Sequence, residues 1–117
     1  MSTSIAMITV DTTDALSLSR WWANQLDGTI VADNDGWFVF VELPSGQRLG
    51  FQKVDRVTPG KNRLHLDLTT DADVDERVQA MVAAGASNLG RREVPGFSWI
   101  TLADPDGNEF CVSGAQH

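Results

Sequence analysis

The sequence predicts an α+β fold built from two tandem β-α-β-β-β modules. The first observation behind this prediction is that one order of elements, strand-helix-strand-strand-strand, occurs twice, in residues 4–54 and 62–113. The second is the stretch between them, residues 55–62, whose Thr-Pro-Gly sequence is typical of a connector. The third is a recurrence of sequence letters at the same points of both modules, which indicates an internal duplication.

In the first module, residues 4–10 are rich in Ile, Met and Val and predict a strand that ends at an Asp-Thr-Thr-Asp turn. Asp14 or Thr13 then caps a helix that runs to residue 26, and Gly28 is expected just past its end. The buried stripe of this helix consists of Leu18, Trp22 and Leu26. Further strands are expected at residues 29–32, 37–43 and 47–54.

The second module opens with strictly alternating residues 62–68, a pattern typical of a strand with one face toward a core. Its three leucines are expected to point to that core, whereas His65 and Asp67 share the opposite face. Asp73 with Glu76 predicts a capping box at the start of the second helix. The remaining strands are expected at residues 86–90, 97–103 and 108–113, with a loop at 91–96 and a turn at 104–107.

The recurring letters lie mostly at turns and helix ends. Thr-Thr-Asp-Ala occurs at residues 12–15 and again at 69–72, an offset of 57 that also pairs Gly28 with Gly85. Pro-Ser-Gly at residues 44–46 corresponds to Pro-Asp-Gly at 105–107, an offset of 61 that implies a loop insertion. Helix caps and turns use these residues in most proteins, so the matching letters alone are weak evidence. The prediction of a duplication depends on the agreement of element order, element spacing and the positions of turns and helix ends.

Composition excludes several classes of function. The chain has 117 residues, enough for one domain with a core, and a net charge of −7, which repels phosphate backbones and predicts no nucleic-acid partner. The same charge favours a cationic ligand over an anionic one. No stretch has the length of a membrane span and no signal peptide is present, so no membrane partner is expected. The single cysteine, Cys111, rules out an internal disulfide and predicts a cytoplasmic location.

The two modules and the final hairpin resemble the vicinal oxygen chelate superfamily of glyoxalases, bleomycin-resistance proteins and extradiol dioxygenases. Residues 103–112, Ala-Asp-Pro-Asp-Gly-Asn-Glu-Phe-Cys-Val, are similar to the hairpin that closes these domains. Asp14 with Trp21 and Trp22 resembles their first helix, and residues 63–68 resemble a strand of the glyoxalase-like subgroup. The resemblance covers nearly the whole chain. It implies a curved eight-stranded sheet around a cup-shaped cavity, and a homodimer.

Enzymes of this superfamily commonly hold a divalent metal ion in the cup. The matching positions here are Ile8, Gly50, His65 and Cys111. Isoleucine and glycine side chains donate nothing, so this set does not form a nitrogen and oxygen site for magnesium, manganese or iron. We therefore expect no cofactor. The alternative is a divalent metal ion held by His65, Gln52 and Glu109, which a two-residue shift in register would bring together.

Several side chains are candidates for lining the cup. The candidate ligand-binding residues are His65, Asp67, Gln52, Arg48, Trp37, Trp99 and Cys111. His65 either contacts a ligand or is hydrogen-bonded within the sheet, and Asp67 either orients the imidazole or pairs with Arg48 or Arg63. Trp37 and Trp99 either wall the cavity or pack in the core. Cys111 is more typical of a small buried apolar residue than of a nucleophile.

The leading hypothesis is a metal-free protein that binds an apolar or aromatic small molecule. The net charge favours a cationic, antibiotic-like ligand. The alternative is a metal-dependent lyase, isomerase or dioxygenase that uses His65, Gln52 and Glu109. A third hypothesis is metal-free acid–base catalysis by His65 with Asp67 or Glu109. If the protein is an enzyme, His65 and Glu109 are the expected catalytic residues.

Overall fold

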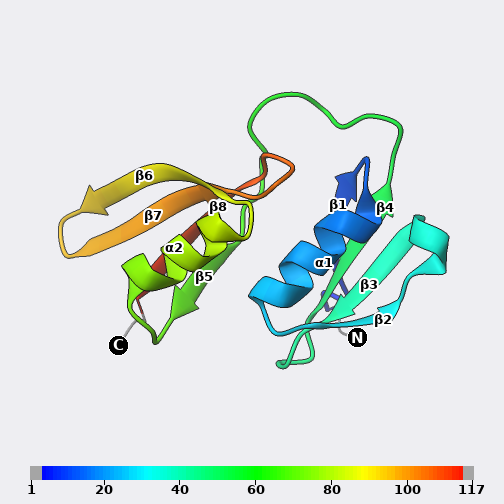
Figure 1. Cartoon of the computed structure of the whole chain (residues 1–117), viewed down its shortest axis with the longest axis horizontal. Helices are drawn as coiled ribbons and strands as arrows, with labels where there is room; N and C mark the ends of the chain where they lie inside the picture. Colours follow the sequence, from blue (N-terminus) through cyan, green and yellow to red (C-terminus); the bar gives the residue numbers. More distant parts are fainter. Residues whose placement is uncertain (1–3, 115–117) are drawn as a thin grey trace. The chain divides into compact units, whose positions relative to one another are not determined.

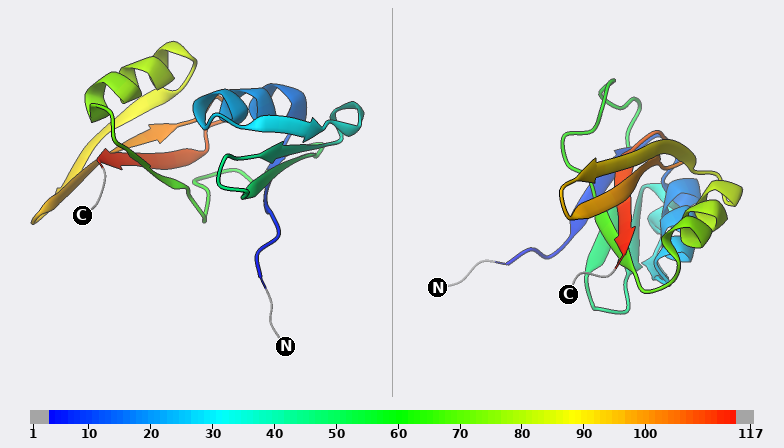
Figure 2. Two further views of the ribbon diagram at one scale, coloured as in Figure 1. Left: turned by 90° about the horizontal axis from the view of Figure 1, so that it is seen from below. Right: turned by 90° about the vertical axis from the view of Figure 1, so that its left-hand side faces the viewer.

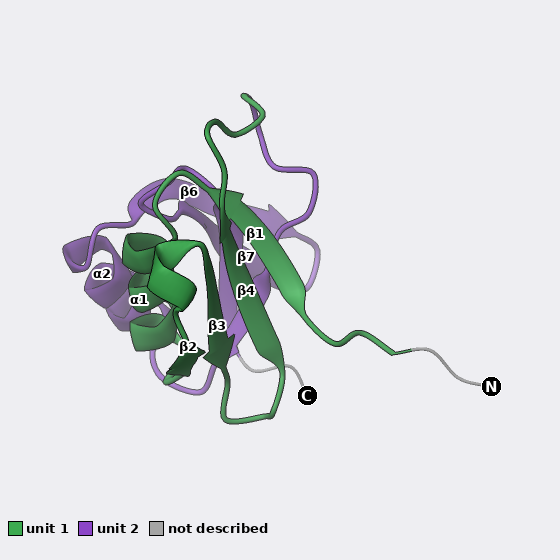
Figure 3. Cartoon of the chain, turned by 90° about the vertical axis from the view of Figure 1, so that its right-hand side faces the viewer, with its two compact units in different colours: residues 1–59 green, residues 60–117 purple. Residues whose placement is uncertain are grey.

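The computed structural model describes residues 4–114 and divides into two compact units between Pro59 and Gly60. Each unit contains one helix and one four-stranded sheet (Figures 1 and 3). The order of elements within each unit is β-α-β-β-β. The predicted α+β class with two tandem modules is therefore confirmed, and each unit is described by itself below.

Unit 1 is the N-terminal unit, and its helix covers one face of its sheet (Figure 2). Its elements are β1 (Ile8–Thr12), α1 (Ala15–Gln25), β2 (Thr29–Ala32), the 3₁₀ turn η1 (Asn34–Gly36), β3 (Phe38–Glu42) and β4 (Arg48–Lys53). The strand order is β1-β4-β3-β2, with β1 parallel to β4 and the other pairs antiparallel. Alternate residues of β3 and β4 are fully buried, as the period of two requires: Val39, Val41, Leu49 and Phe51.

The end of α1 differs from the prediction by one residue. Asp27, not Gly28, adopts the left-handed conformation, with φ 54°, and the Gly28 N–H donates to the Ala23 carbonyl at 2.8 Å. In the second helix Gly85, with φ 120°, takes this position. The pairing of Gly28 with Gly85 is therefore wrong, and Asp27 is the structural counterpart of Gly85. Gly28 is needed for a different reason, because a Cβ there would lie 2.7 Å from Val41 Cγ1.

Unit 2 contains β5 (Asp67–Thr70), α2 (Val74–Ala83), β6 (Ser87–Val94), β7 (Phe97–Ala103) and β8 (Glu109–Gly114). The strand order is β5-β8-β7-β6, with β5 parallel to β8. The Asp73 carboxylate caps α2 by accepting the Glu76 N–H at 3.0 Å, and α2 buries Val78 and Met81. No helix within the described residues is long and apolar enough to cross a membrane.

Two predicted boundaries in unit 2 are wrong. β5 begins at Asp67 instead of residue 62, and Leu64 is 86% exposed, so the three leucines do not all face the core. Alternation marks an extended chain, but only pairing with a neighbour makes a strand, and the β5–β8 ladder begins at Asp67 opposite Cys111. The expected loop at 91–96 is mostly strand, because β6 and β7 pair as far as Val94 opposite Phe97.

Candidate ligand-binding groove

A groove of about 420 Å³ lies against the sheet of unit 2. Ile100, Leu102, Phe110 and Val112 are buried in the core of this unit. Their neighbours in sequence point to the other face of the sheet, because side chains alternate along a strand. The groove is lined by Lys61, His65, Asp67, Leu68, Arg92, Phe97, Trp99, Thr101, Glu109, Cys111 and Ser113.

Strand register brings the candidate residues of the second module together. Asp67 of β5 lies opposite Cys111 of β8, and Cys111 lies opposite Thr101 of β7. On the far side of β7, Trp99 lies opposite Arg92 of β6. Directly opposite residues of paired strands share a face of the sheet, so side chains from four strands converge on one surface.

The apolar wall of the groove is a pair of aromatic rings. Phe97 and Trp99 stack with their ring centroids 5.5 Å apart and their planes inclined by 28°. Trp99 is half-buried and Phe97 is 38% exposed, so both rings remain partly open to the groove. Of the two positions considered for Trp99, the structure places it in the wall of the groove and not in the buried core.

The polar side of the groove is formed by His65 and Asp67. The Nδ1 atom of His65 lies 2.7 Å from Asp67 Oδ1, and both side chains are exposed. A carboxylate only accepts hydrogen bonds, so in the neutral imidazole Nδ1 carries the proton and Nε2 is left as an acceptor. Of the alternatives for Asp67, orienting the imidazole is the one that the structure shows.

Asn62 positions this part of the chain, a role that the sequence did not predict. Its side chain accepts the Glu109 N–H at 2.7 Å, donates to the Glu109 carbonyl at 3.1 Å, and also donates to the Leu64 carbonyl. The Asn62 amide thus pairs with the start of β8 as a strand backbone would. It anchors the segment that brings Lys61 and His65 to the groove. The only sequence signal was an asparagine at the end of a connector, which is too common to single out.

Cys111 behaves as a small apolar residue with a protonated thiol. Burial raises its pKa above the ordinary value, and the negative charge of Asp67 raises it further. The Thr101 hydroxyl, 3.8 Å from the sulfur, opposes this shift by hydrogen bonding. A thiol with a raised pKa is a poor nucleophile near neutral pH.

One cluster of potential metal ligands exists among the described residues. Donor atoms of His65, Asp67 and Cys111 all lie within 4.8 Å of one another. The 2.7 Å separation of the His65 nitrogen and the Asp67 oxygen is, however, a hydrogen-bond distance. Two ligands of a tetrahedral zinc ion lie roughly 3.3 Å apart. One imidazole, one carboxylate and a thiol also suit neither magnesium nor manganese, which prefer several oxygen ligands, so these residues do not fit the divalent metal that the superfamily implies.

The corresponding face of unit 1 is filled by its own side chains. Thr9 lies opposite Gly50 as Asp67 lies opposite Cys111, so the counterpart of His65 is Met7 and the expected pairing with Ile8 is wrong. A Cβ at Gly50 would lie 2.5 Å from Met7 Sδ and 2.7 Å from Phe38 Cε1. Any side chain at residue 50 would therefore require Met7 and Phe38 to move.

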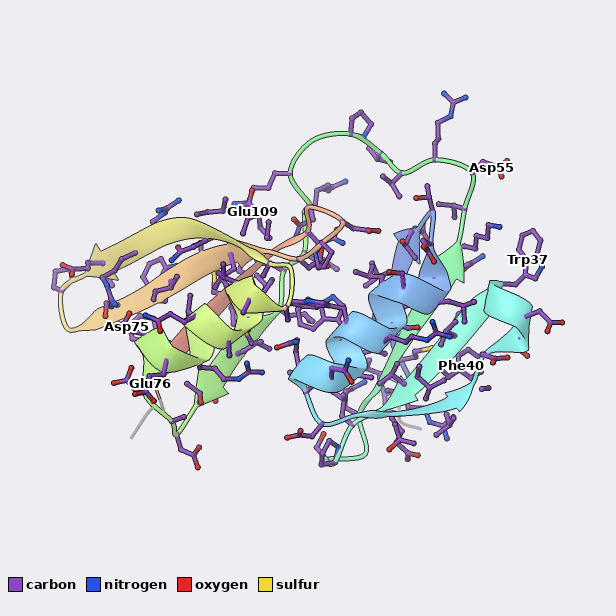
Figure 4. The ribbon with its side chains drawn as sticks, viewed as in Figure 1. Trp37, Phe40, Asp55, Asp75, Glu76 and Glu109 are labelled. Carbon is purple, nitrogen blue, oxygen red and sulfur yellow. The ribbon has the colours of Figure 1, made fainter. Side chains whose placement is uncertain are left out.

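Three of the candidate residues belong to unit 1. Arg48 and Gln52 are exposed on β4, which leaves the metal set of His65, Gln52 and Glu109 with one member outside the groove of unit 2. Trp37 lies just before β3, is 63% exposed, and stands away from its sheet with Lys53 Nζ 5.1 Å from the ring centroid (Figure 4). Ligand contact by these three residues stays a prediction.

Comparison with known proteins places the chain in a family. A family model described as "Glyoxalase-like domain" matches residues 7–113. No curated protein sequence matches the chain.

Several solved structures share the fold. A glyoxalase/bleomycin resistance protein/dioxygenase family enzyme from Burkholderia phytofirmans PsJN is 18% identical, with 95% of this chain and 98% of that chain covered and a TM-score of 0.80. A glyoxalase-related enzyme from Fulvimarina pelagi is 22% identical, with 97% and 89% covered and a TM-score of 0.78.

A further similar structure is a point mutant of the fosfomycin resistance protein FosX from Listeria monocytogenes, in complex with Mn(II) and 1S,2S-dihydroxypropylphosphonic acid. It is 18% identical, with 98% of this chain and 93% of that chain covered and a TM-score of 0.80. At such identities these structures show the fold alone, whereas the family model spans almost the entire sequence. The chain therefore belongs to the glyoxalase-like domain family of the vicinal oxygen chelate superfamily.

Proposed function

We propose that this protein binds a small apolar or aromatic molecule in the groove of unit 2, without a metal ion. The observation that carries the proposal is the groove itself, about 420 Å³ in volume, with stacked aromatic rings on one wall and hydrogen-bonding groups on the other. Ligand sites of roughly 300–1,000 Å³ with an apolar lining and a few convergent polar groups are typical of small-molecule binding.

The geometry supports a flat ligand. A planar ring laid on Trp99 extends the stack that this residue already forms with Phe97, and such aromatic pairs contribute about 0.5–1.5 kcal/mol beyond buried area. The Nε2 atom of His65 accepts a hydrogen bond in the neutral ring, because Asp67 holds the proton on Nδ1. A planar ligand with a polar substituent would satisfy both walls.

Tryptophan fluorescence and thermal shift test this proposal with a panel of planar aromatic compounds. We expect at least one compound to quench the fluorescence and raise the melting temperature of the native protein. Trp99→Leu should abolish both responses. Trp37→Leu changes an exposed tryptophan of unit 1 outside this groove and measures separately whether Trp37 also contacts the ligand. A panel without any binding, or equal binding by the Trp99→Leu variant, would overturn the proposal.

A second candidate is a metal-dependent lyase, isomerase or dioxygenase that uses His65, Gln52 and Glu109. It is favoured by the fact that His65 and Glu109 line the same groove, and by the Mn(II) bound to the FosX structure of similar fold. Elemental analysis of protein purified without chelators separates the two candidates. Stoichiometric metal that is lost on His65→Ala would replace the metal-free proposal.

Metal-free acid–base catalysis is the third candidate, and the hydrogen bond between His65 and Asp67 favours it. In this arrangement the carboxylate fixes the tautomer, and Nε2 takes a proton from a substrate in the groove. Turnover that is abolished by His65→Ala and reduced by Asp67→Asn, with a bell-shaped pH profile, would support it. Turnover unaffected by His65→Ala would eliminate it.

We further propose a cytoplasmic homodimer without nucleic-acid or membrane partners. The family resemblance supports the dimer, the net charge of −7 argues against nucleic acid, and the single thiol of Cys111 is consistent with a reducing compartment. Light scattering after size-exclusion chromatography measures the oligomeric state directly. A mass of one chain at micromolar concentration would contradict the dimer.

A further inference from the structure

The charged residues that line the groove pair with one another, except for one. Lys61 Nζ lies 3.8 Å from Glu109 Oε1, and His65 Nδ1 lies 2.7 Å from Asp67 Oδ1. Throughout residues 4–114, no carboxylate forms an ion pair with Arg92. Of the two cations and two carboxylates in the groove, Lys61 pairs with Glu109 and Asp67 is hydrogen-bonded to the His65 imidazole, so Arg92 is the charged side chain without a side-chain partner.

Comparison with the neighbouring Arg91 shows that the lack of a carboxylate partner depends on which face of β6 the arginine occupies. Arg91 and Arg92 are adjacent on β6, so their side chains point to opposite faces. Arg91 Nη2 forms an ion pair with Asp75 Oδ1 of α2 at 2.8 Å. Arg92 lines the groove, where no carboxylate meets it.

The position of Arg92 places its guanidinium beside the aromatic wall. It lies directly opposite Trp99 across the β6–β7 pair, so the two side chains are neighbours on the same face. Arg92 Nη1 donates to the Leu89 carbonyl at 3.2 Å, which uses one of the five guanidinium N–H donors. Gly90 leaves room for this conformation, because a Cβ there would lie 2.9 Å from Nη1.

We propose that the ligand of this groove is a planar aromatic acid and that Arg92 binds its acidic group. The ring stacks on Trp99 and Phe97, and a carboxylate or similar oxyanion accepts hydrogen bonds from the remaining guanidinium donors. This inference rests on the proposed binding function and specifies the chemical class of the ligand.

The inference departs from the preference for a cation that the net charge alone predicts. Charges further away than the Debye length of about 8 Å at physiological ionic strength are largely screened. The groups inside the groove therefore decide the charge of the ligand more than the surface as a whole does. Among those groups, both carboxylates already have a partner and Arg92 has none.

The experiment compares three probes of the same shape: 2-naphthoate, 2-naphthamide and 2-naphthylmethylammonium. Their dissociation constants are measured by tryptophan fluorescence and calorimetry at low and at moderate salt. We expect the acid to bind about tenfold more tightly than the amide, since a hydrogen bond to a charged group contributes roughly 1.5 kcal/mol. The ammonium probe should bind most weakly, and the preference for the acid should shrink as salt is added.

Arg92→Gln and Arg91→Gln form a matched pair of exposed arginine variants on the same strand. Arg92→Gln should reduce the preference for the acid to about twofold or less, with a smaller loss in binding of the amide, whose carbonyl is an uncharged acceptor. Arg91→Gln should keep the tenfold preference, and Arg92→Lys should retain part of it because the charge remains without the planar fork.

The outcomes separate this inference from the proposal on which it rests. If none of the three probes binds, the binding function and the inference both fail. If the amide or the ammonium probe binds as tightly as the acid, the inference fails and the binding function stands. The same holds if Arg92→Gln keeps the preference, or if Arg91→Gln loses as much of it.

Discussion

Replacing Asn62 with alanine should detach the segment that carries Lys61 and His65 from the sheet of unit 2. The Asn62 side chain makes two hydrogen bonds to the backbone of Glu109, which is 47 residues away in the sequence. Alanine removes both and leaves the part-buried Glu109 N–H without this acceptor. Within residues 4–114, no other side chain accepts that N–H.

The size of the effect follows from these contacts. Each neutral hydrogen bond contributes about 1 kcal/mol net, and a buried donor left without a partner costs about 1–3 kcal/mol. We therefore expect Asn62→Ala to lower the free energy of unfolding by about 2–3 kcal/mol. Asn62→Asp keeps the acceptor for the Glu109 N–H and loses the donor to the Glu109 and Leu64 carbonyls, so its loss should be smaller, about 1–2 kcal/mol.

Urea unfolding and amide hydrogen exchange measure the two consequences. In Asn62→Ala the Glu109 amide should exchange about 30-fold faster, as a change of 2 kcal/mol implies. Asn88→Ala is the control, because Asn88 accepts a single exposed N–H, that of Gly90, at 2.8 Å. Exchange at Glu109 that stays within about threefold of the native rate would refute this reasoning.

Three further predictions concern a thiol, a helix end and a turn. Asp67→Asn removes a negative charge that raises the pKa of Cys111, so this pKa should fall. Alkylation of Cys111 by iodoacetamide at pH 8.5 should then become about two- to fivefold faster. An unchanged alkylation rate would contradict the assigned cause. Asp27→Gly should stabilise the protein by about 0.5–1 kcal/mol in urea unfolding, because Asp27 has φ 54° and glycine adopts this conformation without strain. Gly28→Ala should destabilise it by about 1–3 kcal/mol, because the added Cβ would clash with Val41. If Gly28→Ala were tolerated and Asp27→Gly were destabilising, Gly28 would again be the left-handed residue. Asp104→Ala should lower the unfolding free energy by about 2–4 kcal/mol, since its buried carboxylate accepts two backbone N–H groups at 2.9 Å, and a loss below about 1 kcal/mol would contradict this.

Most of the elements of this fold could be predicted from short stretches of sequence. Asp14 and Asp73 cap their helices as expected, and the Asp-Pro-Asp-Gly turn that begins at Asp104 connects β7 to β8. These features depend on residues within about one turn of each other, so a local pattern is sufficient to specify them. The predicted end of the first helix was wrong by one residue, because either Asp27 or Gly28 could adopt the left-handed conformation. Gly28 instead packs against Val41, where a Cβ would lie too close.

The site was predicted only in part, because its members meet through strand register. His65, Asp67, Trp99, Glu109 and Cys111 were named as candidates, and all five line one groove. Asn62 and Arg92 were missed, since neither stands out from other polar residues until its partner across the sheet is known.

The sequence by itself determined two β-α-β-β-β modules and their family. Only the tertiary structure decided that Met7 and Phe38 lie against Gly50 in unit 1, and that unit 2 has an open groove. It also decided that, within residues 4–114, Arg91 has a carboxylate partner and Arg92 has none. The physical reason is that the period of a strand specifies which residues share a face, whereas the space and charge on that face depend on side chains from distant segments.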